Sequence, residues 1–265
     1  MYIPIFLAFI AALGTWGLTA LGAAIVIFFK TPRQSLLNLM LGFSSGVMIA
    51  ASFWSLLQPA IERADQTFNI PSYIVVTLGF ISGAIFIWVS DKAVTHAITK
   101  TNTSNNLLNK TSRIIMLIIS ITLHNIPEGL AVGVAFGLFN EKNDFSTLMG
   151  AISIAVGIGL QNFPEGAAVS LPLRREGYSR KKSFFYGQLS AIVEPISAVI
   201  GAALVTEIET ILPFALSFAA GAMIIVAVHE LIPECQQNKS EQPYTATMGI
   251  ITGFSLMMLL DVMLG

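Results

Sequence analysis

Two copies of one short polar motif interrupt sequence that is otherwise apolar enough to lie in a membrane. The first copy reads HNIPEG at residues 124–129, and the second reads QNFPEG at residues 161–166. Each copy contains a carboxylate and two other nitrogen or oxygen donors. A glutamate at the centre of a bilayer costs several kcal/mol unless its charge is offset. Two such glutamates in matching frames indicate that a bound cation offsets them.

The spacing within each motif places its donors on one face of a helix. His124 and Asn125 precede Glu128 by four and three residues, and residues at these separations are neighbours on a helix surface. The second motif repeats the spacing before Glu165. The two predicted helices are consecutive and antiparallel, so we expect their polar faces to meet.

Prolines should interrupt the helices beside these carboxylates. Pro127 and Pro164 lack an N–H group, so each should kink its helix and free a carbonyl one turn earlier. Such backbone is tolerated at membrane depth where it lines a protein-filled or water-filled cavity. A third carboxylate, Glu194, precedes Pro195, which is predicted to free the carbonyl of Ala191 in the next helix.

Three ionised, unpaired glutamates at mid-membrane would together cost on the order of 8–10 kcal/mol. One divalent ion nearly neutralises three carboxylates, and two ions slightly over-neutralise them. Protonation of the glutamates is the competing solution. The two can alternate, because metal binding displaces protons. A purely structural role, in which these residues only join helices by hydrogen bonds, does not explain three carboxylates and a histidine.

The composition is that of a membrane protein. The chain is 54% hydrophobic and 11% charged, with a mean hydropathy of +0.75, whereas a soluble domain carries about 25% charged residues. A spanning helix needs roughly 20 mostly apolar residues. Eight stretches meet this length: 3–29, 36–61, 71–94, 113–139, 147–173, 183–205, 211–232 and 244–264. The longest connection, about 97–112, is predicted to be a flexible cytoplasmic loop.

Basic residues predict the orientation of these spans. Of the 14 lysines and arginines, only Arg63 and Lys142 lie outside the loops that follow the first, third, fifth and seventh spans. Lysine and arginine favour the cytoplasmic side. We therefore expect both termini on the non-cytoplasmic side of the plasma (inner) membrane. The net charge of −1 argues against a nucleic-acid partner.

With these motifs the chain resembles the ZIP (Zrt/Irt-like) family of divalent metal transporters, and within it the bacterial GufA-type branch. The match is strongest from His124 to Glu194 and Pro195. The resemblance implies an all-α membrane protein with one domain over residues 1–265. It implies eight transmembrane helices in a 3+2+3 arrangement, with kinked helices 4, 5 and 6 around a buried metal centre. It also implies a homodimer in the lipid bilayer.

The resemblance further implies a two-metal centre between the fourth, fifth and sixth spans. By matching positions, the ligands of the first metal are His124, Glu128, Gln161 and Glu165. The ligands of the second are Asn125, Glu128, Asn162, Glu165 and Glu194, so two glutamates bridge. Gln161 stands where many family members have histidine, which should weaken the first site for zinc. Nitrogen and oxygen donors without sulfur suit Zn, Cd, Fe(II), Mn or Co and disfavour Cu(I).

Further candidate residues lie toward the ends of the spans. Asp91, His229 and Glu230 are predicted at cytoplasmic helix ends, where the resemblance implies a release site and ordinary solvated helix ends are the alternative. His96 is expected to be a surface histidine.

On the outer side, Glu62 and Asp261 are a candidate capture pair, since acidic groups raise the local concentration of cations. Met48, Ala51 and Ser55 resemble positions that line the outer entrance, and packing is the alternative role for the first two.

The leading hypothesis is a carrier that moves divalent metal into the cytoplasm by alternating access, without catalytic activity or a catalytic cofactor. Binding at mid-membrane beside broken helices is common in secondary transporters. The resemblance implies that spans 1, 4, 5 and 6 move against spans 2, 3, 7 and 8. The alternatives are a membrane metal sensor, a channel, and an intramembrane metalloprotease. A protease would need HExxH, and the run that starts at His229 has Pro233 in place of the second histidine.

Overall fold

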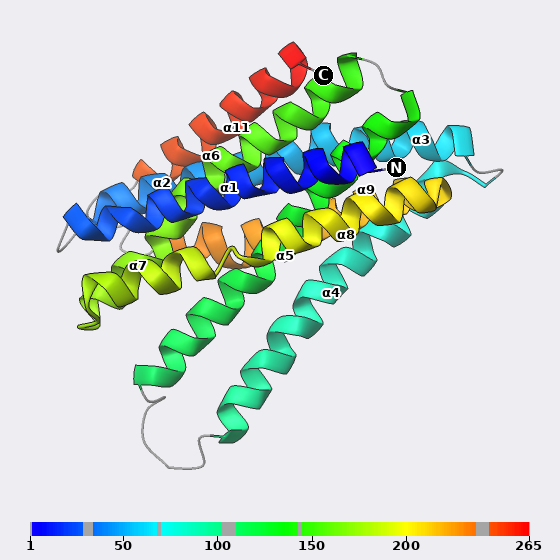
Figure 1. The fold of residues 1–265 in the computed structure, drawn as a ribbon. Helices are drawn as coiled ribbons and strands as arrows, with labels where there is room; N and C mark the ends of the chain where they lie inside the picture. Colours follow the sequence, from blue (N-terminus) through cyan, green and yellow to red (C-terminus); the bar gives the residue numbers. More distant parts are fainter. Residues whose placement is uncertain are drawn as a thin grey trace.

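A computed structural model describes residues 2–28, 34–67, 70–101, 110–142, 145–236 and 244–264, and the regular structure of these residues is helical throughout. The helices form one elongated bundle (Figure 1). The α-helices are α1 (Tyr2–Phe28), α2 (Gln34–Ala51), α3 (Gln58–Thr67), α4 (Ser72–Thr101), α5 (Lys110–Lys142), α6 (Phe145–Arg175), α7 (Arg180–Leu189), α8 (Val193–Glu207), α9 (Leu212–Val226), α10 (Ile232–Cys235) and α11 (Thr245–Leu264). Two π-helices, η1 (Ser52–Leu57) and η3 (Ala227–Leu231), and a 3-10 helix, η2 (Glu209–Ile211), complete the set.

Seven helical stretches among the described residues are long and apolar enough to cross a membrane. They correspond to the predicted spans except the fourth. Three of them join shorter helices end to end: α2–η1–α3, α7–α8 and α9–η3–α10. The fourth predicted span lies within α5, a helix of 33 residues that carries the first motif. Both chain ends lie toward the same end of the bundle (Figure 1).

The structure corrects two local predictions. α4 continues to Thr101 and α5 begins at Lys110, so both ends of the predicted loop 97–112 are helical; residues 102–109 lie outside the described residues. In the sixth span the helix is interrupted between α7 and α8. The carbonyl of Ala191 is not free there, as predicted, because it accepts the N–H of Glu194 at 3.0 Å. α7 ends at Leu189, several residues before Glu194. No α-helical turn therefore precedes Pro195 for that proline to disrupt.

Glycines bring four pairs of helices into backbone contact: α1 with α6, α5 with α8, α2 with α11, and α4 with α9. A Cβ atom at Gly22 would overlap the carbonyl oxygen of Phe163, and one at Gly46 would overlap that of Ile250. Among the described glycines, every Cβ that would come within 3.0 Å of another helix's backbone does so within one of these four pairs. Small residues allow this close approach in membranes.

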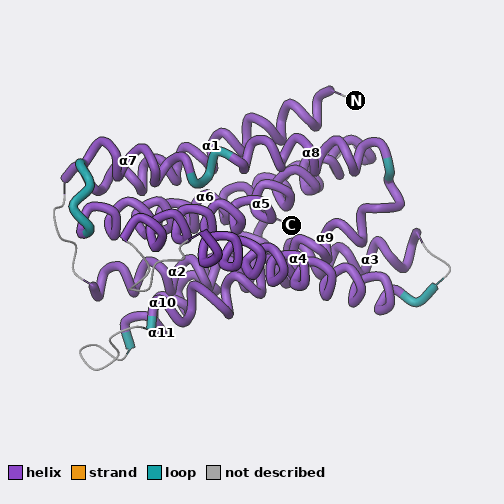
Figure 2. Tube along the Cα trace, turned by 90° about the horizontal axis from the view of Figure 1, so that it is seen from below, coloured by secondary structure: helices purple, strands orange, loops and turns teal. Residues whose placement is uncertain are grey.

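Each of these four pairs lies within one of two groups of helices, which we name after the division of spans that the resemblance implies. The α1/α6 unit is α1, α5, α6, α7 and α8, and the α2/α9 unit is α2, η1, α3, α4, α9, η3, α10 and α11. The two units are in contact, mainly between α2 and α6 and between α5 and α9. In Figure 2, α1, α7 and α8 lie along one side, α2, α3, α10 and α11 along the other, and α5 and α6 between them. Between α6 and α11, Gly157 faces only the flexible side chain of Met257.

Candidate metal centre

The two motifs lie on α5 and α6, in the middle of the bundle (Figure 2). All seven predicted metal ligands are buried, and none is more than 5% exposed: His124, Asn125, Glu128, Gln161, Asn162, Glu165 and Glu194. Burying polar and charged groups is costly unless they are paired or coordinate a metal. The partners of these side chains therefore decide what the site can do.

Two amide side chains of the second motif join the predicted ligands of three helices. Gln161 Nε2 donates to Glu128 Oε1 at 2.5 Å, which links α6 to α5. Asn162 Nδ2 donates to both carboxylate oxygens of Glu194, at 2.9 and 2.8 Å, which links α6 to α8. The structure thus brings carboxylates and amides from α5, α6 and α8 into one cluster.

Four buried oxygens of this cluster accept no hydrogen bond. They are Oδ1 of Asn125, Oε2 of Glu128, Oε1 of Gln161 and Oδ1 of Asn162. The amide nitrogen of Asn125 donates to the carbonyls of Ile121 and Ser190, at 2.8 and 3.2 Å, so its oxygen is the end left for a ligand. An unsatisfied buried acceptor costs about 1–3 kcal/mol. A bound cation would satisfy such buried acceptor oxygens, because it takes the place of the missing hydrogen-bond donors.

The carboxylates themselves are turned toward protein donors. Glu128 accepts from Gln161, Glu165 from Ser44, and Glu194 from Asn162 and Thr15. Among the described residues, no three His, Cys, Asp or Glu side chains lie close enough together to hold a metal ion. A bound ion would therefore have to replace some of these donors, and binding and rearrangement of the glutamates would occur together.

A π-helix places Glu230 against the first motif. In η3 the N–H of Ile232 bonds to the carbonyl of Ala227, five residues earlier, and such wide turns are frequent at functional sites. Glu230 Oε1 lies 2.7 Å from His124 Nε2, whereas His229 is exposed. One predicted release residue therefore contacts a predicted ligand of the first metal.

Asp91, the third predicted release residue, lies on α4. It lines a cavity at the C-terminal end of that helix with Lys92, Thr95 and His96. The ammonium group of Lys92 lies 4.0 Å from the centre of the Trp88 ring. His96 is exposed, as predicted.

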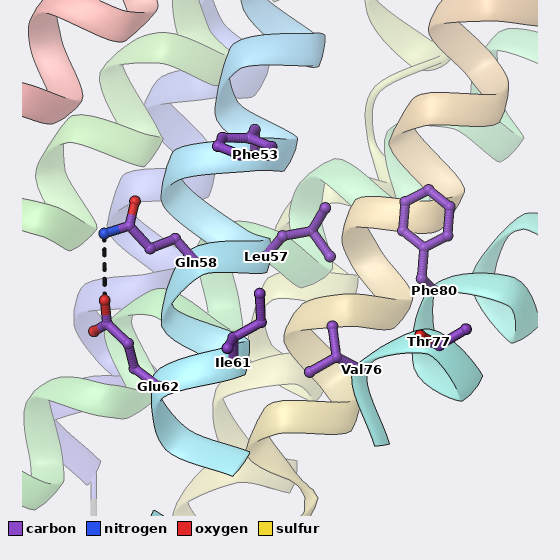
Figure 3. A pocket seen from close by; sticks show the side chains of 8 residues that line it. All are labelled: Phe53, Leu57, Gln58, Ile61, Glu62, Val76, Thr77 and Phe80. Atoms are coloured by element: carbon purple, nitrogen blue, oxygen red, sulfur yellow. Dashed lines mark hydrogen bonds between the residues drawn. The ribbon is translucent and has the colours of Figure 1, made fainter. Parts of the chain in front are cut away.

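The two candidate capture residues have different surroundings. Asp261 of α11 accepts from Ser55 at 2.7 and 2.8 Å, one distance to each oxygen, and from Ser153 at 3.3 Å. Glu62 of α3 accepts from Gln58 at 3.3 Å, beside an apolar groove that η1 and α3 form with α4 (Figure 3). The groove has a volume of about 550 Å³, and its apolar walls are Phe53, Leu57, Ile61, Val76 and Phe80.

The predicted entrance residues are buried. Met48 is 0% and Ala51 1% exposed, and both belong to the main hydrophobic core. Ser55, 7% exposed, lies in η1 and faces Asp261. In this conformation Met48 and Ala51 pack, and only Ser55 offers a polar atom.

Two residues that contact the cluster were not predicted from the sequence. Thr15 Oγ1 of α1 lies 2.5 Å from Glu194 Oε2, and Ser44 Oγ of α2 donates to Glu165 Oε1 at 2.6 Å. Serine and threonine in helices commonly bond to a carbonyl of their own helix. A hydroxyl in an apolar run therefore carries no signal of a distant partner, and only the packing reveals these contacts.

Comparison with known proteins agrees with the motifs. Residues 3–113 and 103–261 match the family described as ZIP Zinc transporter. Human zinc transporter ZIP11 is 37% identical over an alignment of 338 residues that covers 98% of both chains. Zinc transporter GufA of Myxococcus xanthus is 33% identical over 93% of this chain and 94% of its own. Zinc transporter ZIPB of Bordetella bronchiseptica is 32% identical over 93% of this chain and 78% of its own. This chain therefore belongs to the ZIP family of zinc transporters.

Proposed function

We propose that this protein is a carrier that moves zinc or a related divalent cation across a membrane by alternating access. The observation that carries the proposal is the set of four partnerless, buried acceptor oxygens around three buried glutamates. Each of the three relatives is named a zinc transporter, which favours transport over a non-transporting sensor or a protease.

The cluster offers enough donors for two ions. The first metal is assigned to His124, Glu128, Gln161 and Glu165, and the second to Asn125, Glu128, Asn162, Glu165 and Glu194. The partnerless oxygens of Glu128, Gln161 and Asn162 support this assignment. Two ions that share carboxylates lower each other's affinity by charge repulsion, which helps each to leave. Cd, Fe(II), Mn and Co are candidate substrates beside zinc, because the donors are nitrogen and oxygen.

Alternating access requires that the two packing units shift relative to each other. Two hydrogen bonds of the centre cross between them: Ser44 to Glu165, and the contact of His124 with Glu230. A metal that binds Glu165 and His124 competes with both contacts. Cation binding would thus loosen the attachment of the α1/α6 unit in this conformation.

The remaining assignments extend the proposal along the transport path. We assign Glu62, Ser55 and Asp261 to capture of the cation, and Asp91, His229 and Glu230 to its release. The proposal also includes eight membrane spans with both termini on the outer side. It further includes uptake into the cytoplasm across the plasma membrane, and a homodimer. The loop positions of the basic residues support this orientation.

Competitive uptake of radioactive zinc into proteoliposomes tests the proposal. We expect saturable zinc uptake that excess Cd, Fe(II), Mn or Co reduces, because these ions suit the same donors. Metal binding by the purified protein with no uptake would favour a sensor. Uptake that does not saturate with zinc concentration would favour a channel.

His124→Ala should weaken zinc binding without abolishing uptake, because two glutamates and an amide remain for the first metal. We expect the KM for zinc to rise about tenfold, the effect of losing about 1.4 kcal/mol, with little change in maximal rate. His96→Ala is the matched control, since that histidine is exposed at the end of α4. An unchanged KM in His124→Ala would remove this side chain from the ligand set.

A further inference from the structure

We infer that two hydroxyl groups outside the predicted ligand set position the carboxylates of the metal centre. Thr15 holds Glu194 from within the same packing unit, and Ser44 holds Glu165 from the opposite unit. The two residues therefore differ in how long their contacts last during transport. This inference rests on the proposed transport function and adds positioning residues on α1 and α2.

Thr15 completes the hydrogen bonding of Glu194. It is 2% exposed, and its hydroxyl oxygen lies 2.5 Å from Glu194 Oε2 and 3.0 Å from the carbonyl oxygen of Ala12. Asn162 approaches the same carboxylate from α6. Hydrogen bonds to an ionised acceptor are roughly twice as strong as neutral ones. Donors from two helices thus fix the direction of a predicted metal ligand.

The backbone contacts of α1 make this arrangement rigid. A Cβ at Gly166 of α6 would overlap the carbonyl oxygen of Thr19, one turn after Thr15. A Cβ at Gly129 of α5 would overlap the carbonyl oxygen of Glu194 itself. These two contacts join α6 to α1 and α5 to α8, and the hydrogen bonds of Asn162 and Thr15 to Glu194 connect the two pairs. Thr15 should hold Glu194 in every conformation in which this unit moves as one body.

Ser44 reaches the centre from the other unit. It is fully buried, and its hydroxyl donates to Glu165 Oε1 at 2.6 Å. Its helix, α2, packs in backbone contact with α11. The approach is so close that a Cβ at Gly42 would overlap the carbonyl oxygen of Ala246. A shift of one unit along the other separates Ser44 from Glu165. The contact belongs to this conformation, and it competes with a metal for the same carboxylate oxygen.

The neighbouring hydroxyls of α2 and η1 provide a contrast. Ser45 of α2 donates to the carbonyl of Leu41 at 2.8 Å, and Ser52, the first residue of η1, donates to that of Met48 at 2.7 Å, so each bonds to the carbonyl four residues earlier. Ser44 instead bonds to a side chain of α6. Ser44 and Ser45 are equally buried, so they form a matched pair in which only one hydroxyl touches the centre.

Thr15→Val and Thr15→Ser test the first half of the inference by equilibrium titration of the purified, full-length protein with zinc. Valine has nearly the same shape and no hydroxyl, so we expect the Kd of the second zinc, the one assigned to Glu194, to rise about tenfold. Serine keeps the hydroxyl and should restore binding to within about threefold. If Thr15→Val fails to fold, Thr15→Ala replaces it. Wild-type affinity in the folded variant would overturn the role of Thr15.

Ser44→Ala and Ser45→Ala test the second half by the distance between the two units. Spin labels are placed at Ile200→Cys on α8 and Leu78→Cys on α4, both exposed positions, with Cys235→Ser removing the single native thiol. In metal-free protein, we expect Ser44→Ala to shift the distance distribution and Ser45→Ala to leave it unchanged. Identical distributions in the two variants would overturn the role of Ser44.

The wild-type protein separates this inference from the proposed function. Wild-type protein that neither binds nor transports zinc would contradict the proposed function. Wild-type transport together with variants of Thr15 and Ser44 that match it in affinity and in distance would contradict only the positioning roles.

Discussion

Glu128→Ala and Glu165→Ala should each abolish metal uptake while the protein stays folded. Each glutamate is assigned to both metals, so its loss removes one ligand from each ion and one negative charge from the centre. Loss of a group that only supports a ligand typically costs 10–100-fold in metal affinity or activity. For a shared ligand we therefore expect initial uptake to fall by at least about 100-fold. Folding should survive, because Glu128 has one carboxylate oxygen without a partner.

Zinc uptake into proteoliposomes measures this effect, and elution of the detergent-solubilised protein as a single species checks folding. Glu128→Gln preserves the shape of the side chain and should be as inactive as Glu128→Ala, because the charge is lost in both. Glu207→Gln makes the same chemical change at an exposed position at the end of α8, and uptake should be unaffected. Wild-type rates in either alanine variant would contradict the two-metal centre.

Hydropathy and motif spacing predicted the framework of the site. The second motif was expected in a span over 147–173, and α6 extends from Phe145 to Arg175. Polar residues end this apolar run on both sides, so the length of the span can be read from the sequence. Helical spacing also predicted which donors share a face. We also expected the polar faces of the two motif helices to meet, and the hydrogen bond from Gln161 of α6 to Glu128 of α5 joins them.

Tertiary packing decided what the sequence left open. His124 and Glu230 are 106 residues apart, and their contact depends on the π-helical turn of η3. That turn has no simple signal, since an α-helix through the same apolar run satisfies the same pattern. The sequence predicts a proline kink where the helix is in fact interrupted before Glu194. Pro195 indicates where the helix is disturbed but not how the chain bends there.

The hydroxyl partners show the same limit in energetic terms. Thr15 and Ser44 each give one hydrogen bond to a glutamate, and a net hydrogen bond to a charged group contributes about 1.5–3 kcal/mol. An apolar span tolerates one hydroxyl with little change in hydropathy, so the sequence pattern is nearly the same with or without it. Which hydroxyl faces the centre depends on how closely the helices approach, and glycines set that approach.

Gly166→Ala should destabilise the folded protein and displace α1 from the centre. The added Cβ would overlap the carbonyl oxygen of Thr19 and lie 2.8 Å from the backbone nitrogen of Ala23. Both atoms belong to a helical backbone, so neither can turn aside as a flexible side chain would. Overpacking costs about 1–3 kcal/mol, occasionally more. Overlap with backbone atoms that cannot move aside places this site toward the upper end of that range, above the gain of about 1 kcal/mol from replacing glycine by alanine within a helix.

Gly150→Ala is the control for this variant, because it lies in the same helix and its added Cβ would have nothing within 4 Å. Thermal unfolding in detergent should show a lower Tm for Gly166→Ala and an unchanged or higher Tm for Gly150→Ala. A Tm of Gly166→Ala at or above that of the wild type would mean that α1 can move away from α6 at little cost. Thr15 would then no longer be fixed beside Glu194 by the packing of α1, so this one measurement also bears on the rigidity that the metal centre requires.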